Sequence, residues 1–265
     1  MSYSPTAGWC RLFALLLLLA ATVAARADWQ DELTGPDPGE FPPLRSMTLE
    51  YECGWAGLTA GRVSVEFSRV DDMCVLDATA ATTGLARVLW RMDATHEARG
   101  HLLTLKPESV RQKEVYHYQT IRTDLDFDED GVDRFRESTQ DQKPARRKRY
   151  DYPNLFDLQT ALLFVRSQKL DTGDVYRLVV YPATAPYLAT VTVLGREKIK
   201  VKTGSYAAIK IDLQLEKVTD DMTLAPHGKF KHGTGWLSDD ADRIPLRLNA
   251  QLFVGTVWAE LVKLE

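Results

Sequence analysis

Alternation of apolar and polar side chains with a period of two residues dominates this chain from Leu44 onward. Leu49, Tyr51 and Cys53 share one face of an extended segment, and the same spacing returns in the segments that follow. Because successive side chains of a β-strand point to opposite faces of a sheet, the pattern predicts strands with one buried face. Besides the first three segments, which read as an antiparallel meander, we expect strands at residues 110–118, 121–127, 132–138, 175–181, 188–194, 197–201, 206–217, 229–237, 245–252 and 256–263.

One segment, residues 157–168, departs from this pattern. Leu158, Ala161, Leu162 and Val165 recur at helical spacing, and Asp157 stands where it can cap the first turn. Residues 85–91 fit a short helix or another strand equally well. We therefore predict a mainly β, α+β fold, with a large curved antiparallel sheet or a half-open β-barrel and one packed helix.

The first 27 residues have the pattern of a secretory signal peptide. An apolar run at residues 12–24 follows Arg11 and ends on the small-x-small triplet Ala25-Arg26-Ala27. At about 13 residues the run is shorter than the roughly 20 that span a bilayer core. We expect cleavage before Asp28, no transmembrane segment afterwards, and a periplasmic or secreted protein. Residues 28–43 then read as a Pro/Gly-rich tether, and residues 44–265 as a β-rich domain.

Removing residues 1–27 leaves 31 basic and 37 acidic side chains, a net charge of about −6. Nucleic acid is not an expected partner, because phosphate binding needs clustered cations. The one basic cluster comprises Lys143 and the four residues 146–149. We interpret it as a solvated connecting loop, with contact to anionic lipid headgroups as the alternative.

Four carboxylates match the spacing of a calcium loop. Asp126, Asp128, Asp130 and Glu137 stand at positions 1, 3, 5 and 12, with Gly131 at the sharp turn. The strand-like alternation before them, and an aspartate at the usually apolar position 8, favour a β-hairpin that turns at Asp130-Gly131. We therefore expect no cofactor, with calcium as the alternative.

Two cysteines, Cys53 and Cys74, remain after signal cleavage. They form either a disulfide or a pair of buried thiols, and the sequence is compatible with both. In a simple meander Cys53 would stand opposite about Ser64, and Ser64 opposite about Thr79. Cys74 would then lie about five residues out of register, farther than the roughly 7 Å between Cα atoms that a disulfide allows.

Catalytic signatures are missing from the sequence. It contains no Gly-x-Ser-x-Gly elbow, no His-Glu-x-x-His, no phosphate loop and no Gly-x-Gly-x-x-Gly. The histidine pairs 96/101 and 227/232 are five residues apart, and such residues face opposite sides of a strand. A glycosidase with two acids on distant strands stays open, but we favour a protein without catalysis.

Four segments together resemble a bacterial exported family, domain of unknown function 3108. They are residues 51–61, residues 78–90 with Thr83-Gly84-Leu85, residues 201–210, and the ending 236–247 with Asp239-Asp240 and Ile-Pro-Leu-Arg. The resemblance implies a β-rich exported protein and no catalytic residues. The last hairpin is also similar to a strand pair of periplasmic lipoprotein carriers, which enclose a lipid in a half-open barrel.

Two functional hypotheses follow. In the first, the protein is a non-catalytic cell-envelope protein that binds a lipid or another amphiphile in an apolar groove of the curved sheet. Trp90, Leu162, Phe164 and Trp236 are the candidate groove residues. In the alternative, it is a structural or assembly factor that binds envelope proteins through an exposed sheet edge.

Overall fold

The computed structural model describes residues 28–42, 44–140, 144–253 and 255–265. The chain divides into two compact units, residues 1–33 and 34–265. The described part of the first unit is a single 3-10 turn, η1 (Trp29–Glu32), where the Asp28 side chain accepts a hydrogen bond from the Gln30 amide at 3.3 Å. The predicted signal peptide, residues 1–27, lies outside the described residues.

The described residues of the second unit form fifteen strands and two α-helices. The helices are α2 (Gly84–Leu89) and α3 (Leu158–Ser167). The strands are β1 (Met47–Trp55), β2 (Leu58–Val70), β3 (Met73–Thr82), β4 (Met92–His101), β5 (Pro107–Tyr116), β6 (Thr120–Asp128), β7 (Gly131–Ser138), β8 (Arg146–Asp151), β9 (Val175–Val180), β10 (Tyr187–Val201), β11 (Gly204–Val218), β12 (Leu224–Pro226), β13 (Phe230–Ser238), β14 (Pro245–Leu252) and β15 (Gly255–Leu264).

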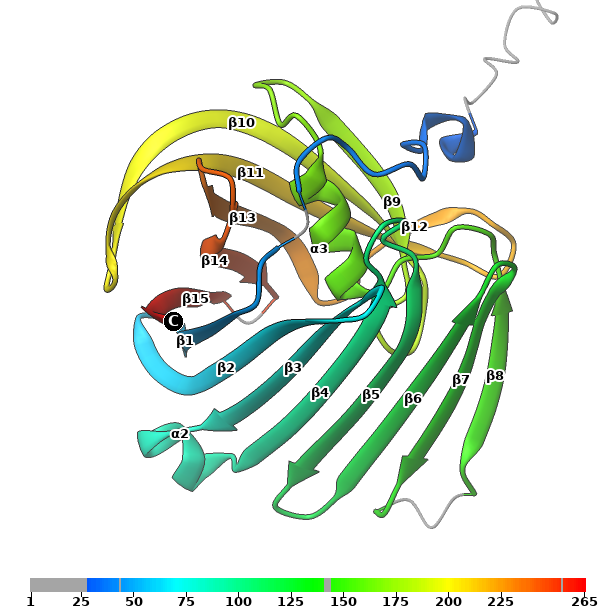
Figure 1. Cartoon of the computed structure of the whole chain (residues 1–265). Helices are drawn as coiled ribbons and strands as arrows, with labels where there is room; N and C mark the ends of the chain where they lie inside the picture. The colour runs from blue at the N-terminus through cyan, green and yellow to red at the C-terminus, as the bar shows by residue number, and fades with distance from the viewer. Residues whose placement is uncertain (1–27, 43, 141–143, 254) are drawn as a thin grey trace, which may run out of the picture. The chain divides into compact units, whose positions relative to one another are not determined.

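All the strands belong to one antiparallel sheet, which is not closed. Among the described residues the order is β8-β7-β6-β5-β4-β3-β2-β1-β15-β14-β13-β11-β10-β9, with β12 beside β11. The sheet therefore has two arms, one from β1 to β8 and one from β14 to β9, joined through β15. Figure 1 shows the sheet curving around α3, which lies on its concave side. The predicted mainly β fold with one packed helix is confirmed.

Most predicted elements are present. The helix expected at residues 157–168 is α3, residues 85–91 contain the short helix α2, and the two strands expected around residues 188–201 are one strand with an irregularity at Gly195. The predicted hairpin at Asp130-Gly131 joins β6 to β7. Three strands were missed, β4, β8 and the three-residue β12. Neither β4 nor β8 has enough apolar side chains to produce a clear alternation, and each owes its extended form to pairing with its neighbours.

The pleat divides the β1–β8 arm into a buried face and an exposed face. Met47, Phe67, Leu76, Ala98 and Val110 are cross-strand partners in one row that continues to Leu125, and this row faces the core. The next row along the strands points to the opposite face and is polar. Partners across an antiparallel pair share a face, so the concave side is apolar and the outer side is charged.

Helix α3 fills one end of the concave side. Asp157 accepts a hydrogen bond from the Thr160 amide at 2.9 Å, and the Thr160 hydroxyl accepts one from the Asp157 amide at 3.2 Å, which completes a capping box. Phe164 is fully buried, with its ring 5.2 Å from that of Phe156. A Cβ atom on Gly100 of β4 would lie 2.6 Å from the Thr160 methyl group. The glycine therefore lets the helix approach the sheet closely.

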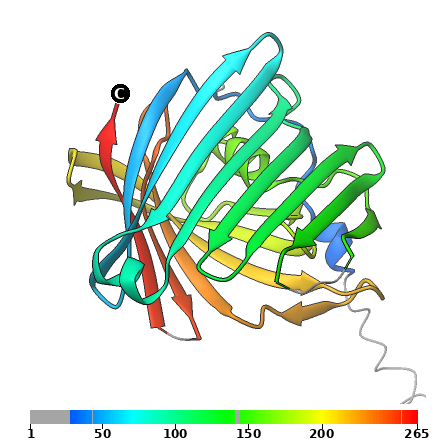
Figure 2. The same ribbon diagram turned by 90° about the horizontal axis from the view of Figure 1, so that it is seen from below.

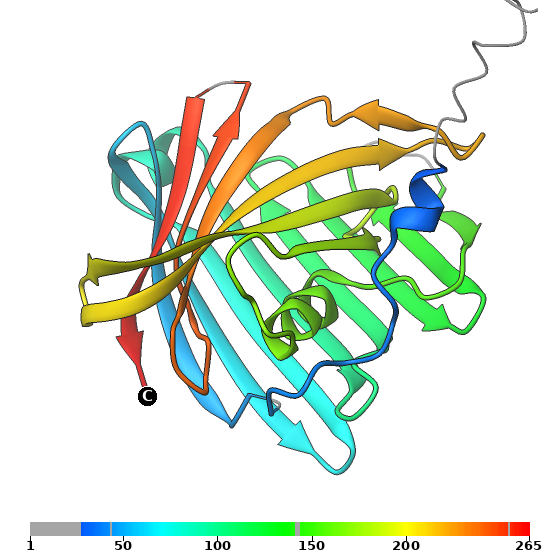
Figure 3. The same cartoon turned by 90° about the horizontal axis from the view of Figure 1, so that it is seen from above.

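Residues 34–42, which we expected to form a tether, belong to the folded unit and run past the end of α3 (Figure 3). The Gly39 amide donates to the Ser167 hydroxyl at 2.8 Å, and the Phe41 amide donates to the Ser167 carbonyl at 3.1 Å. A Cβ atom on Gly39 would meet the Ser167 carbonyl oxygen at 2.2 Å, so only glycine fits there. Proline and glycine content alone does not predict this fixed strap, because the contacts that hold it come from α3.

Two buried arginines secure the end of α3. Arg166 donates to the carbonyls of Pro42, Ala241 and Asp242, and Arg243 donates to those of Arg166, Gln168 and Lys169. The Arg243 guanidinium also lies 3.3 Å from the centre of the Phe41 ring. Burial lowers the pKa of Arg166 to about 10. Carbonyl oxygens that would otherwise lack partners at the helix C-terminus are satisfied in this way.

Both edges of the sheet have features that oppose the addition of another strand. Phe156 forms a parallel bridge with Val180 on β9, and the Thr34 amide donates to the Arg177 carbonyl of the same strand at 3.0 Å. The other edge strand, β8, begins with four consecutive cationic residues, and such charge discourages the addition of another strand. No helix among the described residues has the length and apolar character needed to cross a membrane.

Candidate functional site

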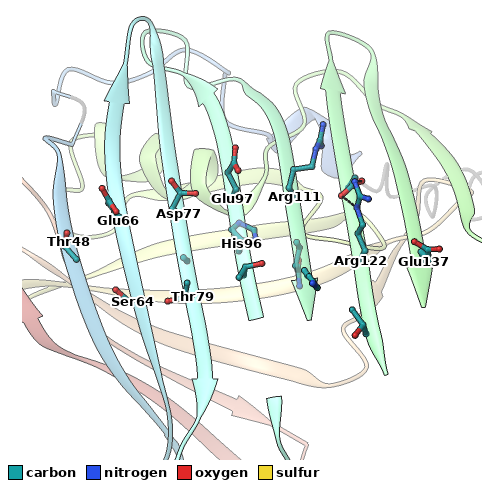
Figure 4. Close-up of a pocket in the computed structure, with 16 residues that line it drawn as sticks. Thr48, Ser64, Glu66, Asp77, Thr79, His96, Glu97, Arg111, Arg122 and Glu137 are labelled. Carbon is teal, nitrogen blue, oxygen red and sulfur yellow. Dashed lines mark hydrogen bonds and ion pairs between the residues drawn. The ribbon is translucent and has the colours of Figure 1, made fainter. Parts of the chain in front are cut away.

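Hollows lie on both faces of the β1–β8 arm. The outer face has a groove of about 740 Å³ between the side chains of β1 to β7, and a second hollow of about 440 Å³ adjoins it. Figure 4 shows acidic side chains on β2 to β4 and arginines on β5 and β6 along the groove. The hollow on the concave face, of about 400 Å³, lies beyond the reach of α3.

The outer groove has the chemistry of a charged sheet surface. Glu66, Asp77 and Glu97 are cross-strand neighbours, and burial together with the two glutamates raises the pKa of Asp77. Arg122 pairs with Asp124 at 2.7 Å. His96 also adjoins the groove, although its position two residues from Ala98 on β4 is on the side of the strand that faces the core. The groove therefore combines ion pairs without a nucleophile held beside a base.

The concave hollow, here called the apolar pocket, has a different lining. Its side chains come from the ends of β1 to β4 and from β14 and β15, and they are almost all apolar: Cys53, Gly54, Trp55, Ala60, Gly61, Arg62, Val63, Ala80, Ala81, Thr82, Trp90, Met92, Leu248, Ala250, Val257, Trp258 and Ala259. Thr82 is satisfied locally, because its hydroxyl accepts from the Met92 amide at 3.0 Å. Arg62 is the one charged residue of the lining.

Small side chains keep the pocket open. On β3 the side of the strand that faces the core runs from Leu76 to Ala80. On β15 the same side includes Ala259, which stands opposite Cys53. Large residues would be needed here to fill the space that α3 fills farther along the strands. Burial raises the pKa of the Cys53 thiol, which keeps the thiol protonated and the lining uncharged.

Large apolar side chains surround the opening of the pocket. Eight of the fourteen exposed large apolar residues in the described chain lie at this end, on the β1–β2 turn, α2 and the end of β14: Trp55, Leu58, Leu85, Val88, Leu89, Trp90, Leu248 and Phe253. We call them the apolar rim. Figure 2 shows α2 and the β1–β2 and β14–β15 turns gathered at one end of the sheet. The Trp90 ring stacks on Tyr116 at 5.8 Å.

A family model described as "Protein of unknown function (DUF3108)" matches residues 50–262. The chain belongs to this family. The resemblance seen in the sequence is thereby confirmed, and the family description names no activity. A comparison with curated proteins found no match.

One solved structure supports the fold of this DUF3108 chain. It is similar to the beta-barrel-like protein of domain of unknown function 1849 from Brucella abortus, with a TM-score of 0.57 and 12% identity over 84% of this chain and 98% of that one. A Bacteroides fragilis protein with a YmcC-like fold gives a TM-score of 0.35 and 9% identity over 86% and 99% of the two chains. The first likeness concerns the fold alone.

Of the four predicted groove residues of the DUF3108 chain, Trp90 alone lines the apolar pocket. Phe164 and Trp236 belong to the buried core, and Leu162 packs against that core from α3. The Trp236 indole donates to Glu197 at 2.6 Å, and Lys210 and Arg247 lie over its ring. Apolar side chains at the β1–β2 and β14–β15 turns, where polar ones are usual, were the sequence signal for the rim that we did not use.

The four carboxylates with calcium-loop spacing are not brought together either. Asp126 pairs with Arg111, and Asp128 accepts from Arg149 at 2.6 Å. Glu137 stands opposite Arg122, at the far end of the hairpin from the turn. Within the described ranges no group of three or more His, Cys, Asp or Glu residues could hold a metal ion.

Cys53 and Cys74 are both free thiols. Cys53 stands opposite Gly61 and Cys74 opposite Arg69, eight residues farther along β2. The predicted partner of Cys53, Ser64, was three residues off, although Ser64 does face Thr79. Cys53 lines the apolar pocket, and Cys74 donates to the Gly100 carbonyl at 3.1 Å beneath α3.

The basic cluster is not the connecting loop that we expected. Residues 146–149 begin strand β8 and pair with β7, while Lys143 lies outside the described residues. Arg147 lies over the Phe135 ring at 5.3 Å, and Arg149 bonds Asp128, Asp133 and Asp151. Cross-strand carboxylates on the β6–β7 hairpin stabilise this extended form, and a count of charges in the sequence does not reveal them.

Proposed function

We propose that this protein is a non-catalytic cell-envelope protein that binds the apolar part of a lipid or other amphiphile in the apolar pocket. The observation that carries the proposal is a hollow of about 400 Å³ with a nearly uncharged lining, open to the exterior at the apolar rim. Ligand sites in proteins typically measure roughly 300–1,000 Å³ and are lined by apolar side chains with few polar groups. Each methylene buried from water contributes about 0.8 kcal/mol, so part of one acyl chain is enough for measurable affinity.

The single charge of the lining lies at its edge. Arg62 has a side chain that is 65% exposed, and it pairs at 3.2 Å with the carboxylate of Glu52, its cross-strand partner. Because cross-strand partners share a face, the guanidinium lies on the outer face with Glu52 and leaves the concave hollow uncharged. An uncharged hollow suits an acyl chain, so a fatty acid is a suitable probe.

The apolar signal segment of residues 12–24 supports a location in the periplasm or outside the cell. The alternative of an assembly factor that binds through a sheet edge has less support, because Phe156 and Thr34 cover β9 and cationic residues line β8. Cargo binding in the pocket needs neither edge.

The test is a titration with a fluorescent fatty acid, using protein that begins at Asp28. Ala80→Phe fills the pocket and should weaken binding by at least about tenfold. Thr79→Phe is the matched control, because Thr79 is the next residue on β3 and faces the outer surface. We expect the control to bind as the wild type does. Equal binding by both variants would exclude the pocket as the site.

Native mass spectrometry of protein purified from its own cell envelope without detergent provides the second arm. A discrete added mass of lipid size, absent from Ala80→Phe, would identify the cargo. A bare polypeptide mass together with no binding of the fatty acid would refute the proposal.

A further inference from the structure

We propose that the apolar rim docks this end of the protein onto the surface of an anionic phospholipid bilayer. This inference concerns the outside of the molecule and holds whether or not the pocket carries a cargo. It rests on the exposure of the rim, on its charge, and on its continuity with the pocket.

Exposure of the rim is extreme on α2. Leu85, Val88 and Leu89 are 70%, 82% and 77% exposed, and no residue of α2 is buried. Single exposed aliphatic residues are ordinary on soluble proteins, whereas a contiguous group on neighbouring turns marks an interaction site. Trp55 and Trp90 join the group, and tryptophan favours the boundary between headgroups and acyl chains.

The charge around the rim matches an anionic surface. Residues 55–62, 83–92 and 248–257 contain three arginines, Arg62, Arg87 and Arg91, and no aspartate or glutamate. The arginines reach Glu52 or Asp93 on the adjoining strands and still keep more than a third of each side chain exposed. Cations beside an exposed apolar group add electrostatic attraction to anionic lipid.

Other turns at the rim end of the sheet also carry exposed aromatic and cationic residues. The β5–β6 turn carries Tyr118, which is exposed, and β8 begins there with Arg146 and Arg147 (Figure 1). At the opposite end of these strands the β2–β3 turn has aspartates at residues 71 and 72, and the β6–β7 turn has three acids at residues 128–130. An anionic bilayer would therefore attract the rim end of the β1–β8 arm more than the opposite end.

Continuity with the pocket favours a bilayer over a protein partner as the occupant. Trp55, Trp90 and Leu248 belong both to the rim and to the lining of the apolar pocket. With the rim in the headgroup region, an acyl chain could move between bilayer and pocket without crossing water. A protein partner on the rim would instead cover the opening.

The test is flotation of protein beginning at Asp28 with vesicles of phosphatidylethanolamine and phosphatidylglycerol, and with vesicles of phosphatidylcholine alone. We expect binding to the anionic vesicles that weakens as salt is added. The triple variant Leu85→Ser, Val88→Ser, Leu89→Ser should bind at least about tenfold more weakly. Leu103→Ser is the matched control, because Leu103 is 82% exposed on the β4–β5 turn at the opposite end of the sheet.

A second measurement uses the native tryptophans and needs no destabilising change. Brominated lipids should quench the emission of the wild type, and the quenching should fall in the double variant Trp55→Phe, Trp90→Phe. Equal flotation of the triple variant and the wild type would overturn the proposal, as would quenching that does not fall when Trp55 and Trp90 are replaced. Binding of an envelope protein to the rim, with no binding of this protein to vesicles, would also overturn the proposal. Failure of docking with fatty acid binding intact would leave the pocket function standing, and the reverse result would leave the docking surface standing.

Discussion

The two ends of the concave face are made of the same strands but have opposite contents. At one end α3 fills the sheet, with Phe164 fully buried and Gly39 and Gly100 allowing the backbone to approach closely. At the other end no described helix covers the strands, and several of the side chains that face the hollow are small ones, such as alanine and glycine. The aliphatic side chains of α2 lie exposed there. One continuous sheet therefore forms both a packed core and an open pocket. The difference between them is whether α3 packs against the strands.

The largest contrast should be in thiol reactivity. Cys53 lines the open pocket, whereas Cys74 is buried beneath α3, where burial raises its pKa to about 11. Maleimide should label Cys53 at least about a thousandfold faster, because Cys74 becomes accessible only on unfolding. The rates are measured by mass spectrometry on Cys53→Ala and Cys74→Ala. Comparable rates would mean that the α3 end opens as readily as the pocket end.

Truncation of a large apolar side chain should cost very different amounts at the two ends. Phe164→Ala removes a ring from the core and should lower the free energy of unfolding by about 3–5 kcal/mol. Leu89→Ala, at the rim, should change it by less than about 0.5 kcal/mol. Urea denaturation measures both. A cost of several kcal/mol at Leu89 would show that the rim packs against the body in solution.

Asp157 should make the α3 end sensitive to pH. Burial raises its pKa to about 6, against about 3.9 in an unfolded chain. Between these values the folded state binds more protons, so this group lowers the free energy of unfolding as pH rises from about 4 to about 6. Its share is about 3 kcal/mol for two pKa units. Asp157→Asn keeps a capping side chain, and its stability curve should lack this decline. Parallel curves for variant and wild type would contradict the expectation.

Local signals in the sequence predicted most of the fold. Alternation located the strands, and the capping position of Asp157 and the turn Asp130-Gly131 depend only on near neighbours, so both were predicted correctly. The pocket depends instead on register. Ala80 and Ala259 face one hollow because β3 and β15 flank the β1–β2 pair, and the pairing of β1 with β15 shifts by a bulge at Glu50/Tyr51. No local pattern predicts that arrangement.

Aromatic residues were a poor guide to the site for a related reason. Trp90 and Trp236 both adjoin strands in the sequence, yet one lies at the pocket and the other beneath Lys210 and Arg247. Residue type indicates that a side chain gains from burial, but the partner strands decide whether it meets the core, the outer face or a hollow. Strand β8 shows the same limit for charged residues, because its Arg149 is held by carboxylates of the β6–β7 hairpin.

The place of β15 in the sheet bears on when the chain can fold. This strand comes last in the sequence but lies between β1 and β14, and the Glu265 amide donates to the Thr48 carbonyl at 2.9 Å. Until residues 255–264 have emerged, the two arms have no shared strand and the rows that cross β1 and β15 cannot be buried. A sheet whose joining strand is made last stays as two separate arms until that strand has been synthesised.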